Sequence, residues 1–318
     1  MNDAQNGTVW ADGALRPWSA LAVPLMSDAV LRSVAVFEGM RADRADDGGI
    51  RLLAGAAHAR RLLASARALR LPVAYGTDEI LAAAAEVARA ELDATGARTA
   101  YVRPMALGAR LTAQAGPCSL TIAAFAQADD SPGTVRAQLS ALRRPSPDAL
   151  PPQLKAVANY QLSRLARLAA QAAGYDDAIL LNAQGRLAEA AGAAVLVEHG
   201  GRVSTPPDWE GCLASITVDV VERIAAHVGV PFRREPVTTA ALAAADGIAL
   251  AGTLAALTEV TRLDDLTVPH GPALATLRRH YLDALAGGPL APLLEYASFP
   301  PPEPDTTAAQ TRSTTAHG

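Results

Sequence analysis

The sequence predicts an α/β protein with two domains, an α+β domain at the N-terminus and a mixed α/β domain after it. Short strand patterns and longer helical patterns alternate along the chain. In the first half, turns and hairpins join most of the strands, whereas helices stand between the strands of the second half. The chain has 318 residues and 50% of them are hydrophobic, which is enough for two cores of ordinary size.

The first elements are short strands and turns. After residues 1–7, which we expect to be loose, Thr8 to Leu15 predicts a hairpin around the turn at Asp12-Gly13. A second turn at 46–49 precedes a predicted strand at 50–53. This pattern is typical of a sheet built from neighbouring strands.

Two helices and two strands complete the first half. Residues 56–69 repeat apolar side chains at helical spacing. Thr77 is predicted to cap a second helix that reaches about Leu92, because a threonine hydroxyl can accept a bond from a free amide of the first turn. Strands are predicted at 99–104 and 120–125.

Composition suggests where the domains end. Residues 126–134 read Ala-Gln-Ala-Asp-Asp-Ser-Pro-Gly-Thr, a run of turn formers that we predict to be a linker. It would separate an N-terminal domain at 8–125 from a C-terminal domain at 135–297. Residues 298–318 are rich in Pro and Thr and poor in apolar side chains, so this tail is predicted to be disordered.

The C-terminal domain is predicted to alternate strands and helices. Either Ser215 or Thr217 caps the second of its helices. The predicted strands cover 135–142, 178–182, 194–198 and 247–251. The predicted helices cover 159–173, a stretch from the cap at 215 or 217 to about 228, 237–244 and 273–285.

Composition also excludes several classes of function. A net charge of −4 offers no basic stripe, which argues against nucleic acid as the main partner. Two cysteines, Cys118 and Cys212, cannot form a disulfide framework or a four-ligand metal site. The first residues lack the pattern of a signal peptide, and charges interrupt the Ala-rich runs before they could span a bilayer. We therefore expect a cytoplasmic protein with a small-molecule substrate.

Lys155 is the only lysine in the chain, although the sequence holds 28 Lys and Arg residues in total. An arginine guanidinium stays protonated and cannot act as an amine nucleophile. A lysine ammonium among apolar neighbours loses its proton more easily and can attack a carbonyl. The alternative is a surface lysine left over in a chain that favours arginine.

A nucleophilic lysine needs an electron sink, and the usual sink is a pyridoxal phosphate ring. That cofactor requires a carboxylate for its pyridine nitrogen and a cradle for its phosphate. Glu189 is the candidate carboxylate, because it is the only acid between Asp177 and Glu198. The alternative is a partly exposed glutamate in a turn.

Two stretches could bind the phosphate. Residues 213–217 lead into a helix N-terminus, where free amides and the helix dipole attract anions. Residues 252–255 would place a hydroxyl and backbone amides at the end of a buried strand. Arg61 could add a fixed charge, and Tyr160 could donate a hydrogen bond to the ring oxygen. Helix caps with Ser or Thr are common, however, and a tyrosine that opens a helix is often simply packed.

Over essentially residues 8–290, the sequence resembles the branched-chain aminotransferase group of the class IV (fold type IV) pyridoxal phosphate enzymes. Seven short motifs in the right order carry this resemblance. They are Phe37-Glu38-Gly39-Met40-Arg41, the run His58 to Leu62, Tyr101-Val102-Arg103-Pro104, the run Lys155 to Tyr160, Glu189-Ala-Ala-Gly192, the run Leu213 to Thr217, and Gly252 to Ala255.

The resemblance implies a homodimeric transaminase that acts on an L-amino acid and a 2-oxo acid by a ping-pong route. Lys155 would hold the cofactor and act as the catalytic base. The implied cofactor-binding residues are Arg61, Lys155, Tyr160, Glu189, Leu213, Ile216, Thr217 and Thr253. The implied substrate-binding residues are Phe37, Arg41, Tyr101 and Arg103, with the backbone amides of Leu254 and Ala255.

Three positions depart from the family pattern. Arg32 stands where a pocket tyrosine is usual, Ala194 where an asparagine is usual, and Val218 where an arginine is usual. Arg32 would favour a polar or acidic substrate, unless it turns outward to solvent. The departures also fit a tailoring aminotransferase of specialised metabolism. An aminodeoxychorismate-type lyase, a D-amino-acid or (R)-amine transaminase, and a non-catalytic binding protein are further candidates.

Overall fold

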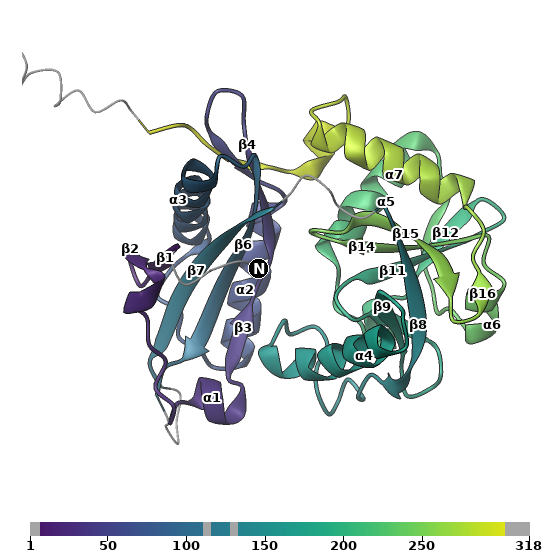
Figure 1. The fold of residues 1–318 in the computed structure, drawn as a ribbon, viewed down its shortest axis with the longest axis horizontal. Helices are drawn as coiled ribbons and strands as arrows, with labels where there is room; N and C mark the ends of the chain where they lie inside the picture. The colour runs from purple at the N-terminus through teal and green to yellow at the C-terminus, as the bar shows by residue number, and fades with distance from the viewer. Residues whose placement is uncertain (1–6, 111–115, 128–132, 303–318) are drawn as a thin grey trace, which may run out of the picture.

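The structure is a computed structural model that describes residues 7–110, 116–127 and 133–302. Its strands form two sheets, which lie side by side with helices packed on each of them (Figure 1). This architecture is α/β, as the sequence predicts. The chain passes from the first sheet to the second after β7 and returns to the first at its last strand.

The first sheet has eight strands, in the order β17-β5-β4-β6-β7-β1-β2, with β3 paired to β6. All of its pairings are antiparallel. The bounds of its strands are β1 Thr8–Ala11, β2 Ala14–Pro17, β3 Ala35–Phe37, β4 Met40–Arg44, β5 Ile50–Leu52, β6 Thr99–Gly108, β7 Cys118–Gln127 and β17 Ala297–Phe299.

One face of this sheet is buried under helices. Alternate residues of β6, such as Val102 and Ala106, join a core with α2 and α3 because side chains alternate between the two faces of a strand. Tyr101 and Arg103 therefore point to the opposite face, towards the second sheet. The helices of this half are α1 Asp28–Arg32, α2 Gly55–Ala68, α3 Thr77–Thr95 and the short η2 Trp18–Ala20.

The second sheet has nine strands, in the order β10-β9-β8-β15-β14-β11-β12-β13, with β16 paired to β15. It is mixed, because β8 runs parallel to both β9 and β15. The bounds of its strands are β8 Thr134–Arg143, β9 Asp177–Leu181, β10 Leu187–Ala190, β11 Ala194–His199, β12 Arg202–Thr205, β13 Phe232–Arg234, β14 Gly247–Gly252, β15 Ala256–Leu263 and β16 Leu266–Thr267.

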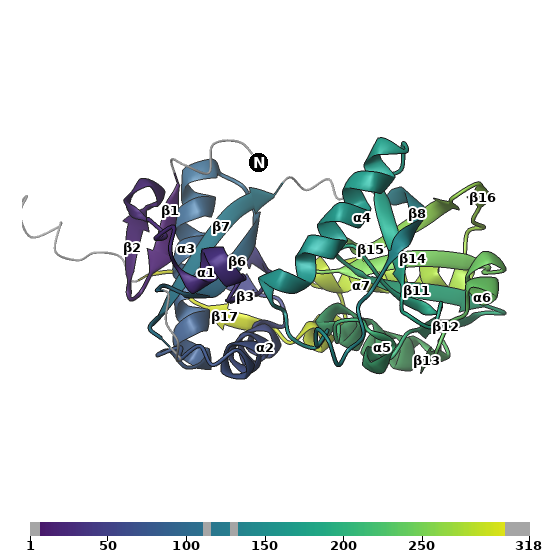
Figure 2. The same ribbon diagram turned by 90° about the horizontal axis from the view of Figure 1, so that it is seen from below.

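Helices lie on both sides of the second sheet, with α4 on one side and α5 and α7 on the other (Figure 2). Apolar residues of α5 and α7, such as Val221 and Leu277, share a core with Leu196 and Ala249 of the sheet. The helices of this half are α4 Tyr160–Ala172, α5 Ile216–Val228, α6 Thr239–Ala243, α7 Pro272–Leu285, and the short η3 Val157–Asn159, η4 Asp208–Glu210 and η5 Ala291–Leu294.

Most of the predicted elements are confirmed, but several of their boundaries differ; β6 and β7, for example, extend beyond the predicted ranges 99–104 and 120–125. Thr77 is the first helical residue of α3 and not its cap, because the side chain of Glu79 accepts the bond from the Gly76 amide that precedes the helix. The predicted linker 126–134 overlaps the end of β7 at Ala126 and Gln127 and the start of β8 at Thr134, and its residues 128–132 lie outside the described ones. Residues 1–6 of the segment expected to be loose also lie outside them.

The end of the chain differs more from the prediction. Ser298 and Phe299, placed in the disordered tail, belong to β17, which pairs with β5 of the first sheet. The Tyr296 hydroxyl also donates to Asp43 of that sheet, at 3.0 Å. A strand of three residues next to prolines has too little pattern to be recognised in the sequence. Residues 303–318 lie outside the described part of the chain. Among the helices described, none has both the length and the apolar character needed to cross a bilayer.

Candidate active site

Lys155 lies between the two sheets, in the loop that joins β8 to η3. Its carbonyl accepts a hydrogen bond from the Phe37 amide of β3 at 3.0 Å, and its own amide donates to Ser65 Oγ of α2 at 3.2 Å. The following residues open α4 of the second half. The first sheet thus holds the backbone of Lys155, while the second half supplies most of the groups around its side chain.

The side chain of Lys155 is enclosed by aromatic rings. Its Nζ lies 2.7 Å from the Tyr160 hydroxyl and 5.1 Å from the centre of the Phe37 ring. Burial disfavours the charged ammonium and, with the nearby positive charge of Arg61, lowers the pKa of Lys155 to about 8. The alternative of a leftover surface lysine does not describe this residue.

Glu189 lies in β10, paired with Leu180 of β9, and not in a turn. No clear strand pattern is visible in the sequence there, because small residues surround the glutamate. One carboxylate oxygen accepts the Leu213 amide at 3.0 Å, and the other lies 3.2 Å from Arg144 Nε. Burial raises the pKa of Glu189, although the charge of Arg144 and the Leu213 bond oppose that rise.

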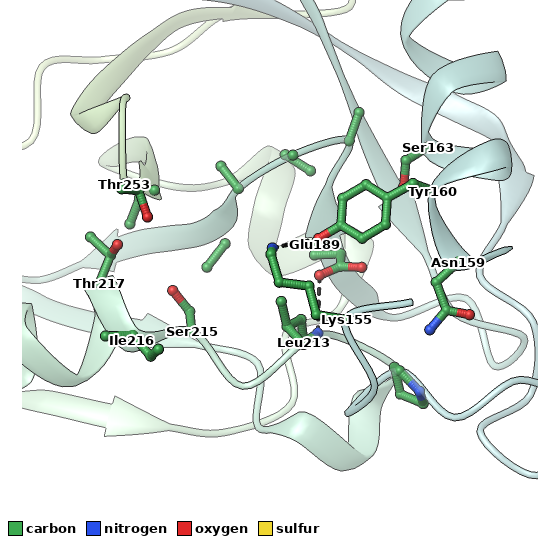
Figure 3. Close-up of a pocket in the computed structure, with 18 of the residues that line it drawn as sticks. Lys155, Asn159, Tyr160, Ser163, Glu189, Leu213, Ser215, Ile216, Thr217 and Thr253 are labelled. Atoms are coloured by element: carbon green, nitrogen blue, oxygen red, sulfur yellow. Dashed lines mark hydrogen bonds between the residues drawn. The ribbon is translucent and has the colours of Figure 1, made fainter. Parts of the chain in front are cut away.

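The N-terminus of α5 opens towards the same space. The Ser215 hydroxyl caps the helix by accepting the Val218 amide at 3.3 Å, and α5 starts at Ile216. In Figure 3 the hydroxyls of Ser215, Thr217 and Thr253 lie on one side of Lys155, with Asn159 on the other. This corner offers helix amides and hydroxyls to an anion.

Arg61 of α2 is held by a buried acid. Glu38 accepts hydrogen bonds from Arg61 Nε at 2.6 Å and from Nη2 at 2.9 Å, while Arg61 Nη1 donates to the Ala214 carbonyl. Burial alone would raise the pKa of Glu38, but the Arg61 charge and a 2.7 Å bond from His58 Nδ1 lower it to about 2. Glu38 is therefore a carboxylate that fixes the direction of Arg61.

All eight predicted cofactor-binding residues line one pocket. The lining residues come from α2, from the loop before α4, from β10 and from the start of α5. The predicted members are Arg61, Lys155, Tyr160, Glu189, Leu213, Ile216, Thr217 and Thr253.

None of the six predicted substrate-binding residues lines this pocket, but Phe37, Tyr101 and Arg103 form a group next to Tyr160. Phe37 packs edge-on against Tyr160, with ring centres 4.7 Å apart. Arg103 stacks over Phe37 and donates to the Tyr101 hydroxyl at 3.0 Å, while its buried Nε has no hydrogen-bond partner among the described residues. Gly39 makes room for this arrangement, because a Cβ there would collide with the Tyr101 hydroxyl.

Arg41 and the turn at 254–255 stand further from this group. Arg41 projects from the same face of the sheet as Tyr101, but its guanidinium is bonded to Asp43 and Thr99. Leu254 is 39% exposed in the β14–β15 turn, which reaches the first sheet where the Thr253 hydroxyl donates to the Gly39 carbonyl at 3.2 Å.

Arg32 does not line the pocket of its own chain. It ends α1, its side chain is 57% exposed, and its guanidinium pairs with Asp28 at 2.6 Å. The alternative in which Arg32 turns outward therefore describes this chain. The effect of Arg32 on substrate preference gains no support from the described site.

Sequence reasoning missed several residues of the site. Arg144 carried no signal, because it is one of many arginines and its partner Glu189 is far away in the sequence. Glu38 and His58 lay inside recognised motifs, but nothing in the sequence showed that they bond to each other. Asn159 holds the loop before α4 by donating to the carbonyls of Pro151 and Leu154.

Comparison with known proteins identifies the family of this chain. The family model for class IV amino-transferases matches residues 35–263, about seven tenths of the chain. The chain belongs to the class IV aminotransferases. A probable branched-chain-amino-acid aminotransferase of Aquifex aeolicus is 28% identical over 284 residues, which cover 87% of this chain and 91% of the relative.

Solved structures agree with this family. The branched-chain aminotransferase of Thermoproteus uzoniensis, solved with norvaline, is 29% identical with a TM-score of 0.84, covering 92% of this chain and 99% of that one. The enzyme of Thermobaculum terrenum in its PLP form is also 29% identical, with a TM-score of 0.83 and the same coverage.

Class IV aminotransferases depend on pyridoxal phosphate (PLP), and the pocket of this member fits that cofactor. Its donor set holds a partly buried amine of lowered pKa, a partly buried carboxylate, and a helix N-terminus next to a guanidinium. These are the three groups that a carbonyl, a pyridine nitrogen and a phosphate require. The prediction of PLP as cofactor is therefore confirmed.

The depressed pKa of Lys155 can be measured directly, because no other lysine competes. We expect acetylation of Lys155 in the cofactor-free protein to speed up with pH and to reach half of its maximal rate near pH 8, since only the neutral amine reacts. Peptide mass spectrometry after short exposure to acetic anhydride gives the rate. In the denatured chain the midpoint should move to about 10.4; equal midpoints in both states would contradict the buried amine.

Glu38→Gln should weaken the binding of the cofactor's phosphate. The substitution removes the charge that holds Arg61, so we expect the Kd for PLP to rise about tenfold, the loss of one charge-assisted bond. Absorbance titration of the cofactor-free protein gives the Kd. Glu86→Gln, at an exposed position of α3, is the matched control. An unchanged Kd in Glu38→Gln would show that Arg61 needs no such partner.

Proposed function

We propose that this aminotransferase moves an amino group between a branched-chain or related L-amino acid and a 2-oxo acid by a ping-pong route. One observation supports the proposal above the others. The only lysine of the chain, the partly buried Glu189 and the N-terminus of α5 meet in a single pocket. This combination is what a covalently held pyridoxal phosphate requires.

Lys155 would carry the cofactor and then serve as the base. When bound, PLP supplies an electron sink for the bond electrons released at Cα of the amino acid. With a pKa near 8, the Lys155 amine can take a proton from Cα and return one close to neutral pH. Glu189 would hold a proton on the ring nitrogen, and Tyr160 would donate to the ring oxygen, as its contact with Lys155 Nζ suggests.

The other predicted residues divide between the phosphate and the substrate. Arg61, Thr253 and the start of α5 at Ile216 and Thr217 would bind the phosphate. Tyr101, Arg103 and the backbone amides at 254–255 would receive the substrate carboxylate next to Phe37, which is supported by the unpartnered Nε of Arg103. Arg41 adds positive charge on the same face of the sheet, although Asp43 already pairs with it.

The substrate class rests on the relatives. Those named above are branched-chain aminotransferases, and one was solved with norvaline, an unbranched aliphatic amino acid. They favour an L-amino-acid transaminase over a lyase and over a D-amino-acid or (R)-amine transaminase. Ala194 and Val218 still differ from the residues that are usual at these positions in the family. A role in specialised metabolism would fit these differences. We also propose that the protein is located in the cytoplasm, as expected from the sequence.

A homodimer is the second part of the proposal. The loop before α1 and α1 itself present apolar side chains to solvent in the single chain. Leu25 is 76% exposed and Met26 is 62% exposed, and Val23, Val30 and Leu31 lie close by in the sequence and are each about half exposed. An apolar surface of this kind is typical of a subunit interface.

Lys155→Ala tests the function. We expect the variant to fold but to lose turnover by at least about 10²–10⁴-fold, because no second lysine can replace the base. In the wild type, borohydride reduction should attach the cofactor permanently to the chain, and its absorbance should stay with the protein. The variant should show no such attached cofactor. A coupled assay with leucine and 2-oxoglutarate measures turnover, and Gln153→Ala, exposed two residues earlier, is the control. Full activity in Lys155→Ala would refute the function.

The homodimer is tested by sedimentation. Wild type should sediment as a dimer, and Leu25→Asp combined with Met26→Asp should shift it to a monomer because a charge on each chain would be desolvated at the interface. Leu266→Asp, at an exposed position of β16, should leave the dimer intact. A monomeric wild type would contradict this part of the proposal.

A further inference from the structure

Arg144 is a buried guanidinium that the roles proposed above do not use. It follows the last residue of β8, and its side chain is only 4% exposed. Arg143 beside it is exposed. Burying an arginine costs free energy unless its charge and its donors are satisfied, so the partners of Arg144 indicate why it is there.

Three segments of the pocket meet at Arg144. Its Nε lies 3.2 Å from Glu189 Oε1 and 3.3 Å from the Gly211 carbonyl, and its Nη1 donates to the Asn159 carbonyl at 3.2 Å. These partners belong to β10, to the loop before α5 and to the start of α4. Glu189 is the one partner among them that carries a full charge.

Glu189 needs this positive charge. Burial raises the pKa of its carboxyl group, and Arg144 is the strongest of the influences that oppose the rise, ahead of the Leu213 amide and Lys155. Tyr160 and Cys212 are the other titratable groups that face it, and burial raises the pKa of both, so neither offers a positive charge. Lys155 would also give up its ammonium charge on binding the cofactor.

We propose that Arg144 is a positioning residue that keeps the Glu189 carboxylate ionised and directed into the pocket, so that Glu189 can hold a proton on the ring nitrogen of the cofactor. This inference rests on the proposed role of Glu189. The proton between the two groups can sit on the ring nitrogen, giving an ion pair, or on the carboxylate, giving a neutral pair. Arg144 contacts the carboxylate side and so favours the ion pair.

The alternative is that Arg144 only clamps the three segments together. The two roles can be separated, because the clamp depends on hydrogen bonds and the ionisation depends on charge. Arg144→Gln keeps donors for the Gly211 and Asn159 carbonyls but removes the charge. Arg144→Lys keeps the charge but cannot reproduce the forked set of bonds.

The first measurement uses the holoenzyme loaded with PLP that carries ¹⁵N in the ring. The nitrogen chemical shift shows whether that atom is protonated. We expect a protonated nitrogen in wild type, in Arg144→Lys and in the control Arg143→Gln, and a neutral nitrogen in Arg144→Gln. A protonated nitrogen in Arg144→Gln at the same pH would overturn the proposal and leave Arg144 as a clamp.

The second measurement needs no cofactor. Infrared difference spectra between each protein and its Glu189→Gln counterpart isolate the Glu189 side chain, as carboxylate or carboxylic acid, across a pH titration. Removing the charge should raise the midpoint by about 1–3 pH units in Arg144→Gln and leave it nearly unchanged in Arg144→Lys. Equal midpoints in wild type and Arg144→Gln would overturn the proposal. This result stands even if Lys155→Ala were to refute the function, so the two failures are distinguishable.

Discussion

The removal of the Lys155 amine from water is the constraint on which the rest of the structure depends. Its backbone is bonded to β3 and α2 of the first half, while its side chain lies against Tyr160 of the second half. Neither sheet alone would enclose the amine. The closeness of the two sheets therefore lowers the pKa of the only lysine in the chain, so the fold itself sets how readily this amine loses its proton.

The charges around that amine are arranged in two separate pairs. Glu38 holds Arg61 beside the start of α5, and Arg144 holds Glu189 on β10. Each of these four charges, of which Glu38 and Arg144 are buried and the other two partly buried, has a partner, which limits the cost of desolvation. The pairing also gives each charged group a fixed direction before any ligand arrives, so that binding requires little reorganisation.

The sequence allowed most residues that line the pocket to be predicted, but not the residues that hold them in place. Lys155, Glu189 and the start of α5 could be predicted because each lies in a short motif with its own chemistry. Arg144 and Glu38 could not, because their roles come from partners that only the tertiary structure brings close. The strand β10 was missed because small residues hide its alternation, and β17 because it has three residues and gains its order from pairing with β5.

The path of the chain limits how the two halves can move. Because β17 returns to the first sheet, the chain connects the two halves twice, once after β7 and once at Tyr296. A single tether would permit free rotation, whereas two allow chiefly a bend about the line between them. The hydrogen bonds that Arg61 and Thr253 make between the halves oppose such a bend as well, so the connections and these bonds together favour one placement of α2 against α5.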